Sequence, residues 1–157
     1  MKNPKRLQRI YELADGPELW DIGCDHSLLA RINAKVKKFS MVYCVDKSKA
    51  SLNKILNEAK DLDFQTIKLV CADGCDLNWP DVSGSVVIAG VGGNTVINIV
   101  TSCPIKFRKK ITWILNPFTS VDKFVKEIEH LFPNVDFERI SIQEKSRECF
   151  IFKFSKS

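Results

Sequence analysis

The feature that most constrains the fold is the alternation of short apolar runs with segments of helical period. The Val- and Ile-rich runs lie at residues 18–22, 41–45, 67–71, 86–89 and 111–115. Between these runs, apolar residues recur at spacings of three and four, as on one face of a helix. Alternation of this kind predicts an α/β fold with βα units on a mostly parallel sheet.

The last part of the chain has a different pattern. Residues 135–143 and 149–154 alternate between apolar and polar with period two, and a short polar segment separates them. This pattern predicts an antiparallel C-terminal hairpin. Five βα units followed by such a hairpin favour a Rossmann-like class I methyltransferase fold with a mostly parallel seven-stranded sheet. A dinucleotide dehydrogenase, whose sheet is usually all parallel, fits less well.

Helices are expected before and between the strands, and three of them have candidate N-terminal caps. Asn3 and Pro4 can cap and start the first helix. The expected helices lie around residues 4–11, 27–37, 48–62 and 95–100, with a further helix after Thr119. Ser48 is the expected N-cap of the third. Thr119 with Asp122 has the spacing of a capping box.

Length and composition indicate a single soluble domain spanning residues 1–157. The chain carries 24 Lys and Arg against 19 Asp and Glu, a net charge of +5, which permits contact with phosphates without requiring it. No apolar run approaches the roughly 20 residues that span a bilayer, and no signal peptide is visible. We therefore expect a cytoplasmic protein; the sequence does not predict its oligomeric state.

Six cysteines allow either disulfides or free thiols. Cys44, Cys71 and Cys149 lie within apolar runs, so buried reduced thiols are favoured over a disulfide framework. No C-x-x-C pair is present, and no metal site is predicted.

Acidic residues stand at the ends of the first three strands, where ligands bind in open α/β sheets. Asp21-Ile22-Gly23 provides a tight turn before a helix N-terminus, without the G-x-G-x-x-G of a nicotinamide site. Asp46 can accept hydrogen bonds from ribose hydroxyls, and Asp73 stands where an adenine amino group can be bound. Each Asp alone is equally explained as a turn or cap residue, but three consecutive acidic strand ends favour a nucleoside cofactor.

The fourth and fifth strands end in segments that suit a flat substrate. Residues 89–94 form a glycine-rich segment able to admit both a cofactor and a substrate, or a merely flexible connection. Asn116-Pro117-Phe118 combines an amide that can bond a base edge with an aromatic ring that can stack. The alternative is that Pro117 ends the strand and Phe118 fills the core.

These blocks resemble the TrmK family of bacterial tRNA (adenine(22)-N(1))-methyltransferases. The family's R-L-x-x-I and D-I-G-S-D-H are similar to residues 6–10 and to Asp21-Ile22-Gly23-Cys24-Asp25-His26. Its I-A-G-M-G-G is similar to residues 88–93, and its Q-P-N aligns with residues 116–118, where the proline is retained. The family has a helical extension after the catalytic domain, and from these residues we expect the catalytic domain without it.

The resemblance implies an S-adenosyl-L-methionine-dependent methyltransferase acting on N1 of an adenosine in tRNA. The residues expected to bind the cofactor are Asp21, Gly23, Cys24, Asp46, Lys47, Asp73, Gly74, Ala89 and Gly90. The residues expected at the reaction centre are Asp25, His26 and Asn116, although a structural hydrogen bond explains His26 almost equally well. Other hypotheses are methyl transfer to a small molecule or protein, and a non-catalytic module that binds the cofactor or RNA.

Substrate contacts are expected from the two substrate-facing loops and from the basic first helix. The residues expected to bind substrate are Gly92, Gly93, Pro117, Phe118, Lys5, Arg6 and Arg9. The helix leads directly into the strand that carries the Gly23 turn, so its cations can lie beside the mouth of the site. For basic clusters in general, a solvated surface is the alternative explanation.

Overall fold

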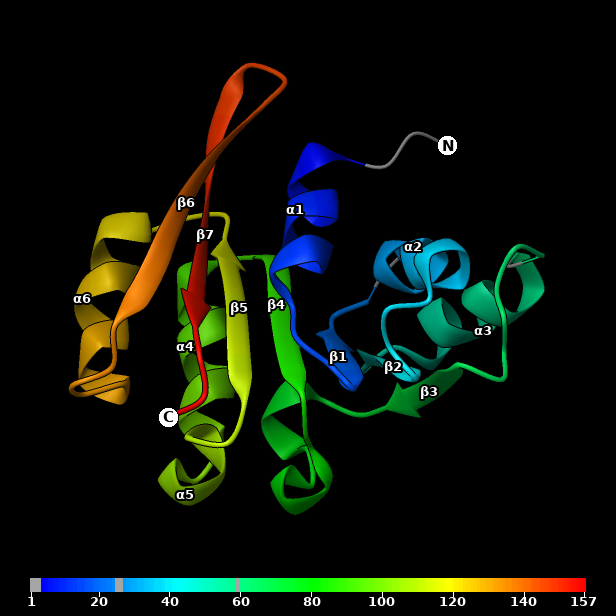
Figure 1. Cartoon of the computed structure of the whole chain (residues 1–157), viewed down its shortest axis with the longest axis horizontal. Helices are drawn as coiled ribbons and strands as arrows, with labels where there is room; N and C mark the ends of the chain where they lie inside the picture. Colours follow the sequence, from blue (N-terminus) through cyan, green and yellow to red (C-terminus); the bar gives the residue numbers. More distant parts are fainter. Residues whose placement is uncertain (1–3, 25–26, 59) are drawn as a thin grey trace.

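A seven-stranded sheet runs through the computed structural model, which describes residues 4–24, 27–58 and 60–157 (Figure 1). The strand order is β3-β2-β1-β4-β5-β7-β6. The strands are β1 (Glu18–Ile22), β2 (Met41–Asp46), β3 (Ile67–Cys71), β4 (Ser85–Val91), β5 (Thr112–Pro117), β6 (Phe137–Glu144) and β7 (Arg147–Phe154). Strands β1 to β5 pair in parallel, whereas β7 is antiparallel to both β5 and β6. The predicted Rossmann-like fold with an antiparallel C-terminal hairpin is confirmed.

Helices cover both faces of the sheet, and each face has its own apolar core. The helices are α1 (Lys5–Leu13), α2 (Leu28–Val36), α3 (Lys49–Glu58), α4 (Gly93–Ser102), α5 (Ile105–Arg108) and α6 (Val121–Leu131). One core joins α1, α2 and α3, and the other joins α4 and α6. Strand β4 serves both, because Val87 belongs to the first core while Val86 and Ile88 belong to the second.

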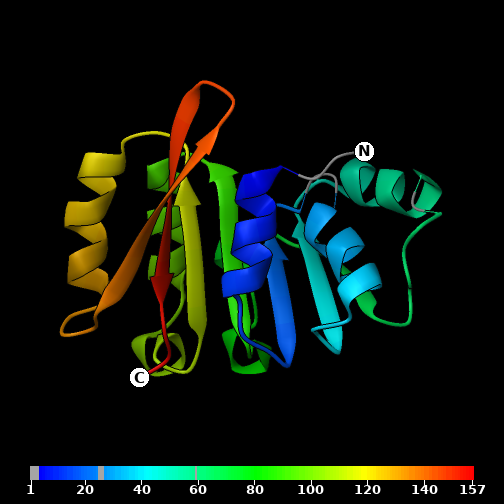
Figure 2. The same ribbon diagram turned by 45° about the horizontal axis from the view of Figure 1, so that its top comes forward.

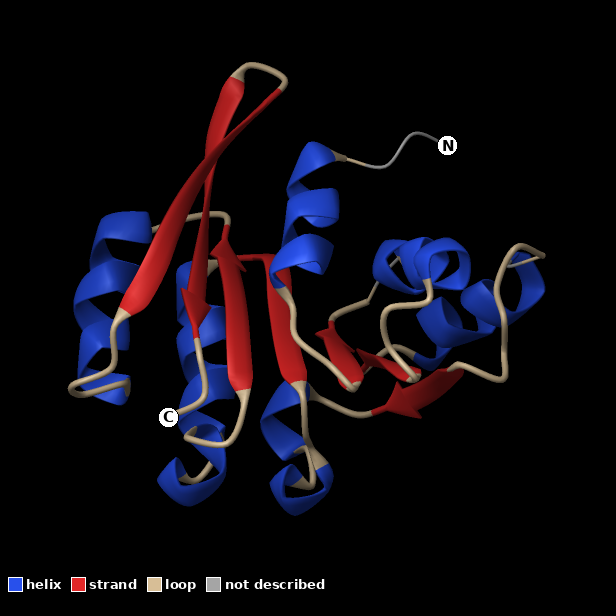
Figure 3. Cartoon of the chain, in the orientation of Figure 1, coloured by secondary structure: helices blue, strands red, loops and turns tan. Residues whose placement is uncertain are grey.

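The first helix and the last two strands lie side by side although they are far apart in sequence (Figure 2). Ile140 and Ile142 of β6 pack against the core that contains Ile10 of α1. The end of the β6–β7 hairpin extends beyond the neighbouring strands, next to the start of α1 (Figure 3). This contact brings the hairpin to the carboxyl edge of the sheet, where the site is expected.

Several expected boundaries are wrong, three of them around β4, α4 and α3. Strand β4 continues past Ala89 to Val91 through a bulge at Gly90, whose φ of +77° suits glycine. Helix α4 starts at Gly93, so the expected flexible segment is reduced to Gly92 between strand and helix. Helix α3 does not continue to Leu62, because residues 60 and 61 form a turn.

Of the expected caps, one is confirmed and one is wrong, and Asn3 lies outside the described residues. The Oγ of Ser48 accepts a hydrogen bond from the Ser51 N–H at 3.2 Å, as an N-cap residue does. Helix α6 has Ser120 as its N-cap and no side-chain capping bond, so Thr119 does not form a capping box. The carbonyl of Thr119 instead accepts from the Gly93 N–H at 3.2 Å, which ties the start of α6 to the start of α4.

The six cysteines are free, as expected, but one predicted position is wrong. Cys44 and Cys149 are buried, whereas Cys71 is exposed because it ends the edge strand β3. No group of three or more His, Cys, Asp or Glu side chains placed to hold a metal ion occurs in the described ranges. Likewise, none of the described helices is long and apolar enough to cross a membrane.

Candidate active site

Two adjoining cavities open at the carboxyl edge of the sheet. The first, called here the α1 cavity, has a volume of about 460 Å³ and is lined by Pro4, Arg6, Leu7, Asp21, Gly23, Cys24, Leu28, Leu29, Asp46, Ala89, Gly90, Val91 and Phe118. The second, called here the η1 cavity, has a volume of about 360 Å³ and adjoins the 3-10 turn η1 (Gly74–Asp76). Its lining is Ile22, Gly23, Val45, Asp46, Lys47, Ala72, Asp73, Gly74, Cys75, Ile88, Val91, Thr95, Asn98 and Ile99. Gly23, Asp46 and Val91 line both cavities, so one ligand can extend from one to the other.

All nine residues expected to bind a cofactor line these cavities. Asp21, Cys24, Ala89 and Gly90 line the α1 cavity. Lys47, Asp73 and Gly74 line the η1 cavity, and the remaining two, Gly23 and Asp46, line both. The parallel strands bring these side chains together because β1, β2, β3 and β4 end at the same edge of the sheet.

The turn after β1 is held in place by its backbone. The N–H groups of Gly23 and Cys24 donate to the Val45 carbonyl at 2.8 and 3.2 Å. Gly23 has a φ of +73°, a left-handed conformation that favours glycine. A Cβ at this position would meet nothing within 4 Å, so the backbone faces open space in which a ligand can approach it closely.

Asp46 ends β2 and has one oxygen engaged in the local fold. Its Oδ1 accepts from the Ser48 N–H at 2.8 Å, which fixes the carboxylate at the start of α3. No side chain or backbone group in the described part of the chain donates to Oδ2. This oxygen is therefore able to accept hydrogen bonds from the hydroxyls of a ligand.

The residues after β3 form the floor and rim of the η1 cavity. The Oδ1 of Asp73 accepts from the Cys75 N–H at 2.8 Å and caps the η1 turn. Gly74 is buried, and a Cβ there would lie 2.7 Å from Cγ2 of Ile22 and 3.0 Å from Cδ1 of Ile99. Glycine is required here because the turn packs directly on the apolar floor. Burial, with the nearby Asp73 carboxylate, raises the pKa of the Cys75 thiol.

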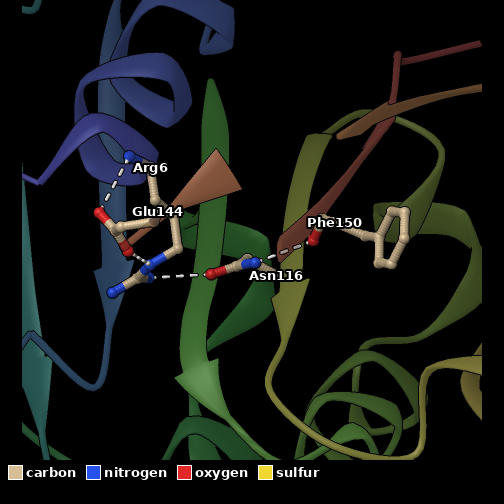
Figure 4. A network of polar contacts seen from close by, with 4 residues as sticks. All are labelled: Arg6, Asn116, Glu144 and Phe150. Carbon is tan, nitrogen blue, oxygen red and sulfur yellow. Dashed lines mark hydrogen bonds and ion pairs between the residues drawn. The ribbon is translucent and has the colours of Figure 1, made fainter. Parts of the chain in front are cut away.

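A polar network joins α1, β5 and the hairpin beside the α1 cavity (Figure 4). Nη1 of Arg6 donates to Oδ1 of Asn116 at 2.8 Å, and Nε of Arg6 lies 3.3 Å from Oε2 of Glu144. The side-chain amide of Asn116 donates to the Phe150 carbonyl at 2.8 Å. Asn116 is completely buried, and both ends of its amide are engaged.

Phe118 forms the wall of the α1 cavity next to this network. The guanidinium carbons of Arg6 and Arg147 lie over its ring, 5.1 and 4.9 Å from the ring centroid. Arg147 also donates a hydrogen bond to the Phe118 carbonyl. The Phe118 N–H donates to the Val91 carbonyl at 2.8 Å, so the residue is fixed on both sides. The ring is therefore a wall of the cavity, not part of the core.

A family model described as a methyltransferase domain matches residues 3–147. The chain belongs to the methyltransferase-domain family. No curated protein matches its sequence.

Solved structures share the fold of this methyltransferase at low identity. TrmK from M. capricolum, in complex with S-adenosyl-homocysteine, is 22% identical with a TM-score of 0.81, covering 100% of this chain and 70% of that chain. The B. subtilis M1A22 tRNA methyltransferase TrmK is 19% identical with a TM-score of 0.77, and the match covers 99% of this chain and 67% of that chain. Precorrin-6y C5,15-methyltransferase from Geobacter metallireducens GS-15 is 18% identical with a TM-score of 0.69, covering 97% and 86%.

Several of the residues expected to bind substrate do not line the cavities of the methyltransferase. Gly92, Gly93 and Pro117 line neither cavity. A Cβ on Gly93 would lie 2.9 Å from the Thr119 carbonyl oxygen, so this glycine serves the packing of α4.

Of the three expected α1 cations, Arg6 alone reaches the α1 cavity. Lys5 is exposed, and Arg9 pairs with Glu12 at 3.1 Å on the surface. Asp25 and His26, expected at the reaction centre, lie outside the described residues.

Sequence reasoning missed four polar residues at the cavities of the methyltransferase or next to them. Thr95 and Asn98, one turn apart on α4, line the η1 cavity. Their spacing of three residues, directly after the glycine-rich segment, indicates two polar side chains on one face of the helix that begins there. From the hairpin, Glu144 contacts Arg6 and Arg147 contacts Phe118 in the wall of the α1 cavity. No local pattern distinguished them from other charged residues of that segment.

Proposed function

We propose that this methyltransferase transfers the methyl group of S-adenosyl-L-methionine to a base in tRNA, at N1 of an adenosine. The observation that carries the proposal is the pair of adjoining cavities that share Gly23 and Asp46. The η1 cavity has two acidic strand ends, Asp46 and Asp73, that suit a nucleoside, and the α1 cavity has an aromatic wall flanked by guanidinium groups. The likeness to TrmK bound to S-adenosyl-homocysteine supports the choice of cofactor.

The residues present fit this cofactor. Oδ2 of Asp46 is available to accept from ribose hydroxyls, and Asp73 stands on the rim of the same cavity as an acceptor for the adenine amino group. The open space at Gly23 admits the amino-acid portion beside Asp21. When bound, the cofactor supplies an electrophilic methyl group on a sulfonium centre.

The part of the α1 cavity beside Phe118 would hold the acceptor base. N1 of adenine carries a free lone pair near neutral pH, so the protein has no proton to remove before attack, and positioning dominates. Phe118 with its two guanidinium neighbours provides a surface on which a base can stack. Asn116, with both ends of its amide engaged, acts by holding Arg6. Asp25 and His26 are proposed, from the family resemblance, to contact the exocyclic amine or the charge on the product ring.

A tRNA substrate, with adenosine 22 as its target, follows from the TrmK resemblance and is supported by the basic α1. Lys5 is exposed and Arg9 is partly exposed on the helix that contributes Arg6 to the cavity wall. Cations in this position can contact the phosphates that flank an extruded nucleotide.

A small-molecule methyltransferase is the second candidate. The precorrin-6y methyltransferase neighbour shares the fold, and the α1 cavity of about 460 Å³ has the size of a small-molecule site.

Transfer of radiolabelled methyl from S-adenosyl-L-methionine to bulk tRNA, followed by nucleoside analysis, tests the proposal. We expect label in 1-methyladenosine with the wild type and little with Asp46→Asn. Label in another nucleoside would show that N1 of adenosine is not the methylated atom. Absence of label with intact cofactor binding would favour the small-molecule candidate.

A further inference from the structure

The end of the β6–β7 hairpin contacts both α1 and the end of β5. Glu144 and Arg147 form the cross-strand pair next to the turn, so their side chains project from the same face of the hairpin. Ile140 and Ile142 leave that face too and pack toward the core that contains α1. From this face, Glu144 bonds Arg6 and Arg147 bonds Phe118.

Glu144 holds Arg6 at two points. Its Oε1 accepts from the Arg6 backbone N–H at 3.4 Å, and its Oε2 lies 3.3 Å from Nε of the guanidinium. The two side chains are 20% and 12% exposed, so the ion pair is largely shielded from water. With Nε held, Nη1 bonds Asn116 and the guanidinium lies over Phe118. The orientation of Arg6 in the cavity wall therefore depends on Glu144.

We propose that Glu144 is a positioning residue for the acceptor base. It fixes Arg6 against Phe118, and thereby shapes the wall that the base contacts. The inference rests on the proposed function, because it assigns the α1 cavity to the substrate. Glu144 itself does not line the cavity, so its effect passes through Arg6.

The charge of Glu144 has a second consequence at this wall. Methylation of N1 turns a neutral base into a cation, and an unpaired guanidinium nearby would repel it. The carboxylate of Glu144 compensates the charge of Arg6, so Arg6 can stand in the wall without adding to the repulsion of the product cation. Loss of Glu144 removes both the orientation of Arg6 and this compensation.

Steady-state kinetics with Glu144→Ala tests the assignment, and Glu138→Ala is the matched control. Glu138 lies on the same strand and face and is exposed, so its removal changes the net charge equally. We expect the KM for tRNA to rise about tenfold in Glu144→Ala, as for loss of a charged hydrogen-bond partner. S-adenosylhomocysteine affinity should stay within about twofold of the control, since the η1 cavity is not involved. Glu144→Gln keeps an acceptor for Arg6 but not the negative charge, so it should recover the part of the KM loss that comes from the orientation of Arg6.

The outcomes separate this inference from the proposed function. A wild type that methylates tRNA, with equal KM values for the Glu144→Ala and Glu138→Ala variants, overturns the positioning role alone. Equal losses in tRNA and cofactor affinity also overturn it, because they indicate general damage, and so does a Gln variant as weak as the Ala variant. A wild type that methylates no tRNA overturns the proposed function and this assignment with it.

Discussion

Asp46 can be tested with a substitution that leaves the local fold intact. Asp46→Asn keeps Oδ1 as the acceptor for the Ser48 N–H but removes the carboxylate. The ribose hydroxyls of the ligand would then lack a full acceptor, which costs about 1 to 3 kcal/mol of binding free energy. S-adenosylhomocysteine should therefore bind roughly 5- to 150-fold more weakly. Calorimetric titration measures the change, with Asp122→Asn on the exposed side of α6 as control. An unchanged Kd in Asp46→Asn would refute the ribose contact.

Cys75 and Cys71 form a second test of where the cofactor lies. Both thiols are exposed, but Cys75 lines the η1 cavity and Cys71 does not. At about 100 times its Kd, S-adenosylhomocysteine should slow the alkylation of Cys75 by a large factor and leave Cys71 unchanged. Peptide mass spectrometry after timed labelling distinguishes the two sites. Equal protection of both cysteines, or of neither, would contradict the assignment of the η1 cavity to the cofactor.

The pH dependence of the same labelling has a defined sign. Burial and the Asp73 carboxylate raise the pKa of Cys75, so less reactive thiolate is present at neutral pH than for an ordinary cysteine. The alkylation rate of Cys75 should therefore continue to rise beyond the usual thiol pKa. A plateau at or below that pKa would be inconsistent with the raised value.

Individual side chains were predictable where they follow a strand directly. Asp46 and Asp73 could be placed because strand ends in a parallel sheet share one edge. The role of Asn116 was not predictable, because its partners, Arg6 and the Phe150 carbonyl, lie 110 and 34 positions away in sequence. A buried amide with distant partners looks in sequence like an amide free to bind a base.

At the scale of elements, α1 is expected to face the RNA. The double reversal of Lys5 and Arg9 to Glu should weaken tRNA binding at low salt by tenfold or more, because phosphate contacts are lost. Each lost contact should also lower the slope of log affinity against log salt concentration by about one. Cofactor affinity should not change, because neither residue lines a cavity. Filter binding across a salt series measures both the affinity and its slope.

The control for α1 lies at the end of α2. Lys35 and Lys37 are exposed there, and their reversal changes the net charge by the same amount. If the α2 variant lost as much tRNA affinity as the α1 variant, general charge and not α1 would determine binding.

Element types were predictable and their ends were not. Short apolar runs identified the five parallel strands, a period of two identified the hairpin, and a period of three to four identified the long helices. The ends depend on contacts between elements: Gly93 begins α4 where the Thr119 carbonyl accepts its N–H, and the bulge at Gly90 extends β4. Helix α5 was not expected at all. Arg108 in that helix is buried and donates to the carbonyls of Cys103 and Leu131.

For the whole molecule, the distribution of charge is more informative than the net charge of +5. The carboxylates of Asp46 and Asp73 line the η1 cavity, whereas Arg6 lines the α1 cavity and Arg147 lies over its Phe118 wall. A cationic sulfonium suits the first environment and a polyanionic substrate the second. The sequence gives only the sum, because this separation arises when the sheet brings distant segments together.

The bond between Arg6 and Glu144 also has a consequence for the order in which the site can form. These residues are 138 positions apart, whereas every residue that lines the η1 cavity lies between Ile22 and Ile99. A chain synthesised from its N-terminus contains the whole lining of the η1 cavity long before the hairpin exists. Until β7 pairs with β5, the guanidinium of Arg6 has no carboxylate partner from β6 and Phe118 has no Arg147. The wall of the α1 cavity is therefore the last part of the site to be completed during biosynthesis.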